Sequence, residues 1–527
     1  MKATYIDYSD TLSFSSLLLN YFENNENLSG FYGNRPDEAG FTKQINSKTF
    51  KHRKVLVNAL LEQQKNCQTS KESLANINLL NEPNSYTITT GHQLNIFTGP
   101  LYFIFKIATA IKLAMDLKDQ FPSSNFIPVY WMASEDHDFE EINHTHISRH
   151  TIKWNKEASG ATGRLSTSDI KEAVQTYQNI LGLSENSYKL AQIIEKAYLG
   201  QSNLADATRS LANQLFGDYG LVVIDADQIE LKQLFIPVIK EDILEQNSSR
   251  EVEKTSKELS DAGFKTQVHG RDINFFYLKD NYRERIILNR DGKYEILNQQ
   301  RYFSKNELLK EIEKHPERFS PNVIMRPVYQ EIILPNLAYI GGGAEINYWM
   351  QLKGVFDHYQ IDFPILIPRN SAMIADGTLG EKIYRLNFTY KSIFKNTEVL
   401  KKEYVRVHSK HRLNLNDEWL EFTSLFEKIK LRAYKIDPTL GPSTDAIEAR
   451  LKKAIDRLEK KLLKADQNNY KEALNQIERI KEKLFPGGVL QERIENFGPY
   501  YVKYGDSFIR ELIHKFKPLE FKFTILY

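Results

Sequence analysis

Two strand-like runs of apolar and β-branched residues, each followed by a polar turn, constrain the fold of this chain most strongly. The run at residues 86–89 leads into a turn at 90–100, and an apolar helix pattern over 101–117 follows it. The run at 126–132 leads into a charged stretch at 134–144. Because ligands of parallel α/β sheets bind beyond the carboxyl ends of the strands, the sequence predicts an α/β fold in which both turns line one pocket.

The turn at residues 90–100 has the features of an anion-binding site. The unpaired N–H groups and the positive dipole end of a helix can bind a phosphate or a carboxylate, and Pro100 suits the first helical position. We expect His92 beside this site, with Thr98 and Gly99 at the helix start. The alternative is that His92 only caps the helix or fills the turn.

The charged stretch supplies candidate proton acceptors. Asp136, His137 and Asp138 follow the second run after a gap of three residues, and Glu140 lies two positions further on. The alternative is a solvated acidic loop, which the apolar strand before it disfavours.

Four histidines close together also suggest a metal site. His137, His144, His146 and His150 lie within 14 positions of one another, but their irregular spacing matches no recognised ligand pattern. The sequence therefore predicts no metal firmly.

Several motifs occur together and in a fixed order. They lie at residues 90–93, 98–102, 135–144, 326–331, 339–345, 349–353, 364–371 and 485–493. In this combination the chain resembles the cysteine-adding enzymes of bacillithiol biosynthesis, a family of cysteine ligases, over essentially its whole length. It departs from the family at His92, where many members carry Gln, and at Gly343-Ala344, where the family pattern is Pro-Gly.

The resemblance implies a Rossmann-like core with connecting-peptide insertions, as in class I aminoacyl-tRNA synthetases and nucleotidylyltransferases, and a helical coiled-coil domain that pairs two protomers. It implies amide formation between the carboxylate of cysteine and the amine of glucosaminyl-malate. A nucleotide, ATP, is expected from the resemblance only, because the chain has neither a Walker motif nor Gly-x-Gly-x-x-Gly.

The pattern along the chain agrees with such an organisation. Alternating segments between 264 and 297 indicate an antiparallel meander, and apolar residues at steps of three and four between 417 and 485 indicate long amphipathic helices. The expected parts are a helical layer of the core (1–84), the first part of the core (85–263), an antiparallel insertion (264–300), the second part of the core with its Gly-rich turn (301–416), a coiled-coil arm (417–485) and a segment that returns to the core (486–527). Packing of the arm within one protomer is the alternative to an intersubunit coiled coil.

Amide formation needs an activated carboxylate and a neutral attacking amine, so the site needs cationic or N–H donors and a proton acceptor. The candidate catalytic residues are His92, Asp136, His137 and Asp138. The candidate substrate-binding residues are Gln93, Thr98, Gly99, Glu140, Arg326, Gln330, Glu331, Gly341, Gly342, Gly343, Glu345, Trp349 and Arg369. Two alternatives stay open: the glycines form only a tight turn, and the polar residues near Arg326 only fasten two domains.

Composition excludes some classes of function. With 70 Lys and Arg against 68 Asp and Glu, the formal charge of +2 gives no electrostatic argument for nucleic acid or membrane as a partner. The single cysteine, Cys67, excludes an internal disulfide, and no signal-like segment opens the sequence, so we expect a cytoplasmic enzyme. A nucleotidyltransferase or metal-dependent hydrolase acting on another small molecule is the second hypothesis, and a non-catalytic scaffold is the third.

Overall fold

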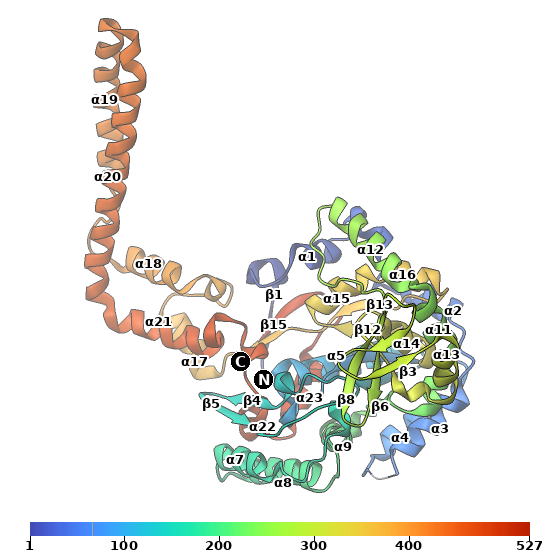
Figure 1. Ribbon diagram of the computed structural model, residues 1–527. Coiled ribbons are helices and arrows are strands. Elements are labelled where there is room, and N and C mark those ends of the chain that lie inside the picture. The colour runs from blue at the N-terminus through green and yellow to red at the C-terminus, as the bar shows by residue number, and fades with distance from the viewer. Residues whose placement is uncertain (66) are drawn as a thin grey trace. The chain divides into compact units, whose positions relative to one another are not determined.

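The computed structural model in Figure 1 describes residues 1–65 and 67–527. The chain forms two compact units. Unit 1 contains residues 1–9, 13–373 and 490–526, and unit 2 contains residues 10–12, 374–489 and 527. The chain therefore leaves unit 1 after Met373 and returns to it at Leu490.

Unit 1 is built on a five-stranded parallel sheet in the order β13-β12-β2-β3-β6. Its strands are β2 (Ser85–His92), β3 (Asn125–Met132), β6 (Val222–Asp225), β12 (Asn336–Gly341) and β13 (Ile365–Pro368). The helix α5 (Leu101–Gln120) connects β2 to β3. The order reverses between β2 and β12, which makes the carboxyl ends of these two strands the expected ligand crevice. The predicted α/β class is confirmed.

Side chains of the sheet alternate between two apolar cores, as they do in strands that are covered on both faces. Ile88 and Ile340 pack with the inner side of α5, whereas Val129 and Tyr339 belong to the core on the opposite face.

The remaining helices and strands of unit 1 before and between the sheet strands are β1 (Ala3–Asp7), α1 (Ser16–Phe22), α2 (Glu38–Ser47), α3 (Arg53–Gln63), α4 (Lys71–Leu79), α6 (Phe139–Ile142), β4 (His144–Ile147), β5 (His150–Lys153), α7 (Lys171–Leu181), α8 (Glu185–Leu199), α9 (Leu204–Phe216), α10 (Ile229–Gln233), α11 (Ile236–Glu245), α12 (Asn247–Asp261), α13 (Lys305–Lys314), α14 (Met325–Ile333), α15 (Gly343–Gln351) and α16 (Lys353–His358).

A second sheet, antiparallel, is inserted between α12 and α14. Its order is β10-β9-β8-β7-β11, with β7 (Phe275–Lys279), β8 (Tyr282–Leu288), β9 (Tyr294–Ile296), β10 (Arg301–Phe303) and β11 (Phe319–Pro321). The alternating pattern predicted these antiparallel strands, but the sheet extends beyond residue 300. Residues 266–269 form a loop instead of the first strand, because the side chain of Gln351 binds the backbone N–H groups of Gln267 and Val268 at 2.7 and 3.1 Å.

Unit 2 is helical, with α17 (Gly377–Arg385), α18 (Thr397–His408), α19 (Asn416–Ile436), α20 (Gly441–Gln467) and α21 (Lys471–Leu484). Figure 1 shows α19 and α20 side by side as a long helix pair. Residues 374–416, which the sequence assigned to the core, belong here. Lys401 of α18 bonds to Glu478 of α21 at 2.5 Å, and Lys481 donates to the carbonyl of Ile393 at 2.8 Å.

The last part of unit 1 follows the helical unit. It contains α22 (Gly498–Tyr504), α23 (Ser507–Lys515) and β15 (Lys522–Leu526). β15 pairs antiparallel with β1, and their sheet also includes β14 (Ala372–Ile374). Across residues 1–65 and 67–527, no helix combines the length and the apolar character that a membrane crossing requires.

A buried polar network ties β2 to β12. The side-chain oxygen of Asn336 accepts hydrogen bonds from the hydroxyls of Thr87 at 3.1 Å and Thr89 at 2.8 Å, and its amide donates to Glu331 at 2.7 Å. All four side chains are buried. Buried polar groups are costly when they lose their partners, so Asn336 fixes these neighbours together.

We predict that Asn336→Leu lowers the free energy of unfolding by about 2–4 kcal/mol, because Thr87, Thr89 and Glu331 each lose one buried hydrogen bond. Urea unfolding followed by tryptophan fluorescence measures this. The control is Asn78→Leu on α4, where the exposed amide donates only along its own helix to Leu74. Equal unfolding midpoints for the two variants would contradict the network's role.

Candidate active site

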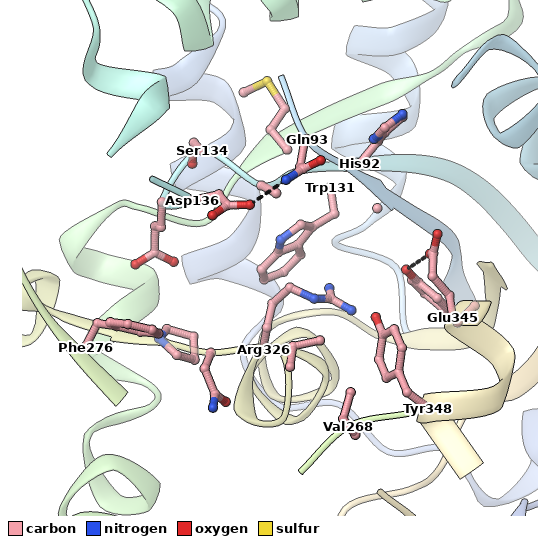
Figure 2. A pocket seen from close by; sticks show the side chains of 18 of the residues that line it. His92, Gln93, Trp131, Ser134, Asp136, Val268, Phe276, Arg326, Glu345 and Tyr348 are labelled. Atoms are coloured by element: carbon pink, nitrogen blue, oxygen red, sulfur yellow. Dashed lines mark hydrogen bonds between the residues drawn. The ribbon is translucent and has the colours of Figure 1, made fainter. Parts of the chain in front are cut away.

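A cavity of about 590 Å³ opens at the carboxyl ends of β2, β3 and β12, where the strand order reverses (Figure 2). The antiparallel sheet and the loop before it form the opposite wall. The cavity is lined by Gly91, His92, Gln93, Tyr102, Lys106, Trp131, Met132, Ala133, Ser134, Glu135, Asp136, Val268, His269, Arg271, Phe276, Arg283, Pro321, Asn322, Val323, Arg326, Tyr339, Glu345 and Tyr348. Of the predicted site residues, His92, Gln93, Asp136, Arg326 and Glu345 lie in this lining.

Lys106 and Glu345 form a buried ion pair in the cavity wall. The Lys106 ammonium lies 2.5 Å from Glu345 and donates to the carbonyl of Gly91 at 2.8 Å, while the Tyr339 hydroxyl donates to the other Glu345 oxygen at 2.7 Å. Burial lowers the pKa of Lys106, and the Glu345 carboxylate acts in the opposite direction. Lys106 was absent from the predicted site residues; the available signal was a lysine within an apolar helix pattern.

Arg326 lies among aromatic rings. Its guanidinium carbon is 5.6 Å from the ring centres of Trp131 and Tyr339 and 5.8 Å from that of Trp349. Nη1 donates to Gln330 at 3.0 Å, whereas the buried Nη2 has no hydrogen-bond partner among the described residues. Because a buried guanidinium N–H is costly to leave unpaired, Arg326 is suited to bind an anionic group in the cavity.

Asp136 supplies negative charge on another side of the cavity. Its carboxylate accepts hydrogen bonds from the Gln93 amide at 2.8 Å and from the backbone N–H of His137 at 2.7 Å. Burial opposes ionisation of Asp136, but hydrogen bonds from His137 and Gln93 and the charge of Arg283 outweigh it and hold its pKa below the usual value. Asp136 is therefore a fixed negative charge at neutral pH and a weak base.

Arg283 comes from the antiparallel sheet and was not predicted. Its guanidinium lies 3.9 Å from the Phe276 ring centre and donates to the Ser320 hydroxyl and the Pro321 carbonyl, both at 3.0 Å. It also lies 3.0 Å from Nδ1 of His137. His137 is exposed and contacts Arg283 and Asp136 from outside the cavity lining.

Two further ion pairs lie beside this part of the cavity, and Glu135 belongs to one of them. Lys232 is fully buried, and its ammonium lies 2.5 Å from Glu135 and 3.0 Å from the carbonyl of Phe319 in β11. Arg164 donates two hydrogen bonds to Asp227, at 2.8 and 3.0 Å. Burial and the nearby Glu135 charge raise the pKa of Asp227 to about 7, against the opposing effect of Arg164. Through its bonds to Glu135 and to the carbonyl of Phe319, Lys232 holds the antiparallel insertion against the end of the parallel sheet.

His92 is packed into the wall. Its ring stacks on Tyr102 at 5.2 Å and 24° and lies 5.2 Å from Phe103, and its buried Nε2 has no hydrogen-bond partner among the described residues. Figure 2 shows the ring directed away from Trp131 and Arg326. Burial, and then the charges of Lys106 and Arg369, lower the pKa of His92 well below its ordinary value, so the imidazole is neutral at neutral pH.

The start of α5 is not the anion site that the sequence predicted. Pro100 precedes the helix as its N-cap, and the first helical N–H, of Leu101, donates to the carbonyl of Glu495 at 2.8 Å. The carbonyl of Gly99 accepts a hydrogen bond from Asn496 at 2.7 Å. Thr98 and Gly99 therefore lie in a buried contact with the C-terminal part of unit 1, outside the cavity lining.

Asp138 and Glu140 also lie outside the cavity lining. The side chain of Asp138 caps α6 by accepting from the N–H of Glu141 at 3.4 Å, and Glu140 forms a surface ion pair with Lys153 at 3.2 Å.

The glycine turn packs against the protein itself. Gly341 ends β12 and Gly342 is the N-cap of α15. A Cβ on Gly341 would lie 3.1 Å from Glu345 and Tyr339, and a Cβ on Gly343 would lie 3.1 Å from Leu18 of α1. Packing therefore accounts for small residues here, and the three glycines do not line the cavity.

Gln330, Glu331, Trp349 and Arg369 lie behind the cavity wall. Glu331 accepts from Gln330 at 2.9 Å, fully buried Trp349 stacks on Tyr339 at 4.3 Å, and Arg369 forms a buried ion pair with Glu492 at 2.7 Å. These residues support lining residues and do not reach the cavity themselves.

The four histidines at residues 137–150 do not converge on one site. His144 and His146 have ring centres 5.3 Å apart on β4, and Nδ1 of His146 pairs with Thr151 at 2.9 Å. Within the described ranges 1–65 and 67–527, no three His, Cys, Asp or Glu side chains are grouped so that they could hold a metal ion.

Two family models cover the chain between them. Residues 1–370 match "Bacillithiol biosynthesis BshC, N-terminal Rossmann-like domain", and residues 372–527 match "Bacillithiol biosynthesis BshC, C-terminal coiled-coil domain".

Similar full-length proteins carry the name "Putative cysteine ligase BshC". The protein from Flavobacterium johnsoniae is 43% identical over 530 residues, covering 100% of both chains. The protein from Flavobacterium psychrophilum is 42% identical over 531 residues, covering 100% of this chain and 99% of its own. The protein from Christiangramia forsetii is 40% identical over 534 residues, with the same coverage.

Glu331 makes the fold sensitive to pH. Burial raises its pKa from 4.5 to about 7, while Lys48 and the donors Asn336 and Gln330 act in the opposite direction. A carboxyl with a raised folded-state pKa binds its proton more tightly in the folded state, so its contribution to stability falls as pH rises from about 4.5 to 7 and is constant above that.

We predict that Glu331→Gln removes this dependence. Relative to the wild type, the variant gains up to about 1.4 kcal/mol of stability per pH unit across that range. Urea midpoints at about pH 5, 6, 7 and 8 measure the difference. A difference that does not change with pH would show that Glu331 is ionised in the folded protein.

Proposed function

Because this chain belongs to the BshC family of bacillithiol biosynthesis, we propose that it is a cysteine ligase that joins the carboxylate of cysteine to the amine of glucosaminyl-malate. One observation carries the choice of substrate: the cavity has opposite charges on different sides. Figure 2 shows Arg326 and Asp136 on different sides of Trp131. Lys106 and Glu135 also line the cavity, and each is paired with an opposite charge, Lys106 with Glu345 and Glu135 with Lys232.

Glucosaminyl-malate has the complementary chemistry, with carboxylates on its malate and an amine on its sugar. The Arg326 guanidinium binds a malate carboxylate, while the nearby Lys106 is already paired with Glu345. Asp136, which stays ionised, holds the sugar ammonium at the other end and so orients it for attack. Trp131 lies between these groups in Figure 2 and offers an apolar ring to the sugar.

In this proposal, cysteine and the energy source bind against the cavity wall that the antiparallel sheet forms. Arg283 and Arg271 add positive charge there, which fits the phosphates of ATP as well as the carboxylate of cysteine. ATP, when bound, supplies the activation of the cysteine carboxylate. The ammonium must pass a proton to solvent water before the amine attacks, and Asp136 binds the ammonium until that transfer.

We predict that a host lacking this gene contains no bacillithiol and accumulates glucosaminyl-malate. The wild-type gene restores bacillithiol. Asp136→Asn restores less than about one tenth as much, because the cavity loses the charge that holds the ammonium. Mass spectrometry of low-molecular-weight thiols measures all three strains.

Asp138→Asn is the matched control, since this neighbouring carboxylate caps α6 outside the cavity lining and an asparagine also caps helices well. It should restore bacillithiol as the wild type does. Normal bacillithiol in the deletion strain would overturn the proposed function and favour a nucleotidyltransferase or hydrolase acting on another small molecule. Full restoration by Asp136→Asn would remove Asp136 from the site.

We also propose that the helical arm pairs two copies of this chain. Leu425, Ile429 and Ile436 of α19 recur at steps of four and seven, and they expose 56%, 45% and 81% of their surface. Exposed apolar residues at helical spacing form a stripe that another helix can cover. The arm of a second copy fits this stripe, because a homodimer brings identical stripes together.

Leu425→Lys combined with Ile429→Lys should convert the dimer into a monomer, because both charges would be buried in the interface. Light scattering coupled to size-exclusion chromatography measures the mass. The control is a pair of lysines at Asn416 and Glu427, exposed polar positions of the same helix that lie on another face than the stripe. A monomeric wild type, or a variant with the wild-type mass, would contradict pairing through this stripe.

A further inference from the structure

The segment at residues 490–498 is unusually polar for a buried part of the chain. It is the first segment of unit 1 after the helical unit. Gln491, Glu492 and Asn496 expose 1%, 0% and 0% of their surface. Polar side chains are buried this completely only where they have partners, so the partners of this segment show what it holds in place.

Glu492 holds Arg369. One Glu492 oxygen accepts from Nη2 of Arg369 at 2.7 Å, and the other accepts from the backbone N–H of Ala372 at 2.9 Å. The Arg369 guanidinium lies 5.3 Å from the Tyr102 ring centre, and Tyr102 in turn stacks on His92. Tyr102 and His92 line the cavity, whereas Glu492 and Arg369 do not.

Asn496 holds the loop that joins β2 to α5. Its amide donates to the carbonyls of Phe97 at 2.8 Å and Gly99 at 2.7 Å. In this loop Phe97, Thr98 and Gly99 have φ values of 52°, 70° and 60°. Residues other than glycine rarely adopt this left-handed backbone conformation, and surrounding contacts must stabilise it. Asn496 provides such contacts from a distant part of the sequence.

Both contacts act on elements that carry cavity residues. The loop fixes where α5 begins relative to the end of β2, so it sets the position of Tyr102 and Lys106 relative to His92. Arg369 directly follows β13, and its backbone N–H donates to the carbonyl of Gly341 at 2.8 Å. Its backbone is thereby fixed, and its guanidinium holds Tyr102 from the side of β13.

We propose that the segment at 490–498 positions the substrate cavity, with Glu492 and Asn496 as positioning residues for the ligation. This inference rests on the proposed function of the cavity. It makes a complete site depend on the chain that follows the helical unit, although that chain contributes no side chain to the cavity lining.

The test uses Glu492→Gln in the full-length protein. Glutamine keeps the shape of the side chain but places one N–H₂ against the donors that surround Glu492, so Arg369 loses its charge partner. We expect KM for glucosaminyl-malate to rise about tenfold or kcat to fall by a similar factor. Independently of activity, the Cε1–H signal of His92 in ¹³C-histidine NMR should shift, because the ring stacked on it moves; the signal is assigned with His92→Gln.

Glu495→Gln is the matched control. It lies three residues away, and its side chain accepts from the N–H of Ser148 in an exposed contact at 3.1 Å. The substitution leaves the Glu495 backbone carbonyl in place, and we expect wild-type kinetics and an unshifted His92 signal. If Glu492→Gln does not fold, the double variant Glu492→Gln with Arg369→Gln removes both buried charges and should give the same His92 shift.

A folded Glu492→Gln protein with wild-type KM, kcat and His92 signal would overturn the inference. Equal changes in Glu495→Gln would overturn it as well. If the wild type does not ligate cysteine, the proposed function fails, and the His92 signal alone still decides whether Glu492 positions the cavity wall.

Discussion

Charges buried at the carboxyl edge of the parallel sheet must be paired, and several distant parts of unit 1 supply their partners. An isolated buried charge costs several kcal/mol, whereas a paired and hydrogen-bonded one is tolerated. Lys106 pairs with Glu345, and Arg369 pairs with Glu492. Arg326 differs, because aromatic rings surround it and Nη2 has no hydrogen-bond partner in the described part of the chain. Because the neighbouring charges are already paired, an anionic ligand gains the most binding free energy at this guanidinium.

The strand order explains how distant residues meet at this edge. β2 and β12 lie side by side, so Lys106 of the helix after β2 reaches Glu345 of the helix after β12, 239 residues later in the sequence. The antiparallel insertion and the segment at 490–498 then close the edge from two other parts of the chain. Lys232, which is paired with Glu135, donates to the carbonyl of Phe319 and so holds the insertion in place. The cavity is thus a product of topology, because stretches that are far apart in the sequence line it.

The sequence predicted the position of cavity residues that come soon after a strand better than that of cavity residues from other parts of the chain. Gln93 and Asp136 line the cavity because parallel strands end at one edge. Thr98 and Gly99 were placed wrongly at an anion site, because the backbone of the distant segment at 490–498 occupies the start of α5. Arg283 lies within an antiparallel strand, where no local pattern marks a site residue. The boundary at 373 was also missed, since the short helices that follow it pack on α21 through contacts that periodicity does not reveal.

Binding of glucosaminyl-malate to the purified protein shows directly whether Arg326 receives the substrate's carboxylates. Isothermal titration calorimetry would compare the wild type with Arg326→Gln and with Arg385→Gln, a control at an exposed arginine of α17. We expect the wild type and the control to bind alike and Arg326→Gln to bind about ten- to a hundredfold more weakly, as for a lost charge-assisted hydrogen bond. Equal affinity of Arg326→Gln and the wild type would show that Arg326 does not bind the substrate.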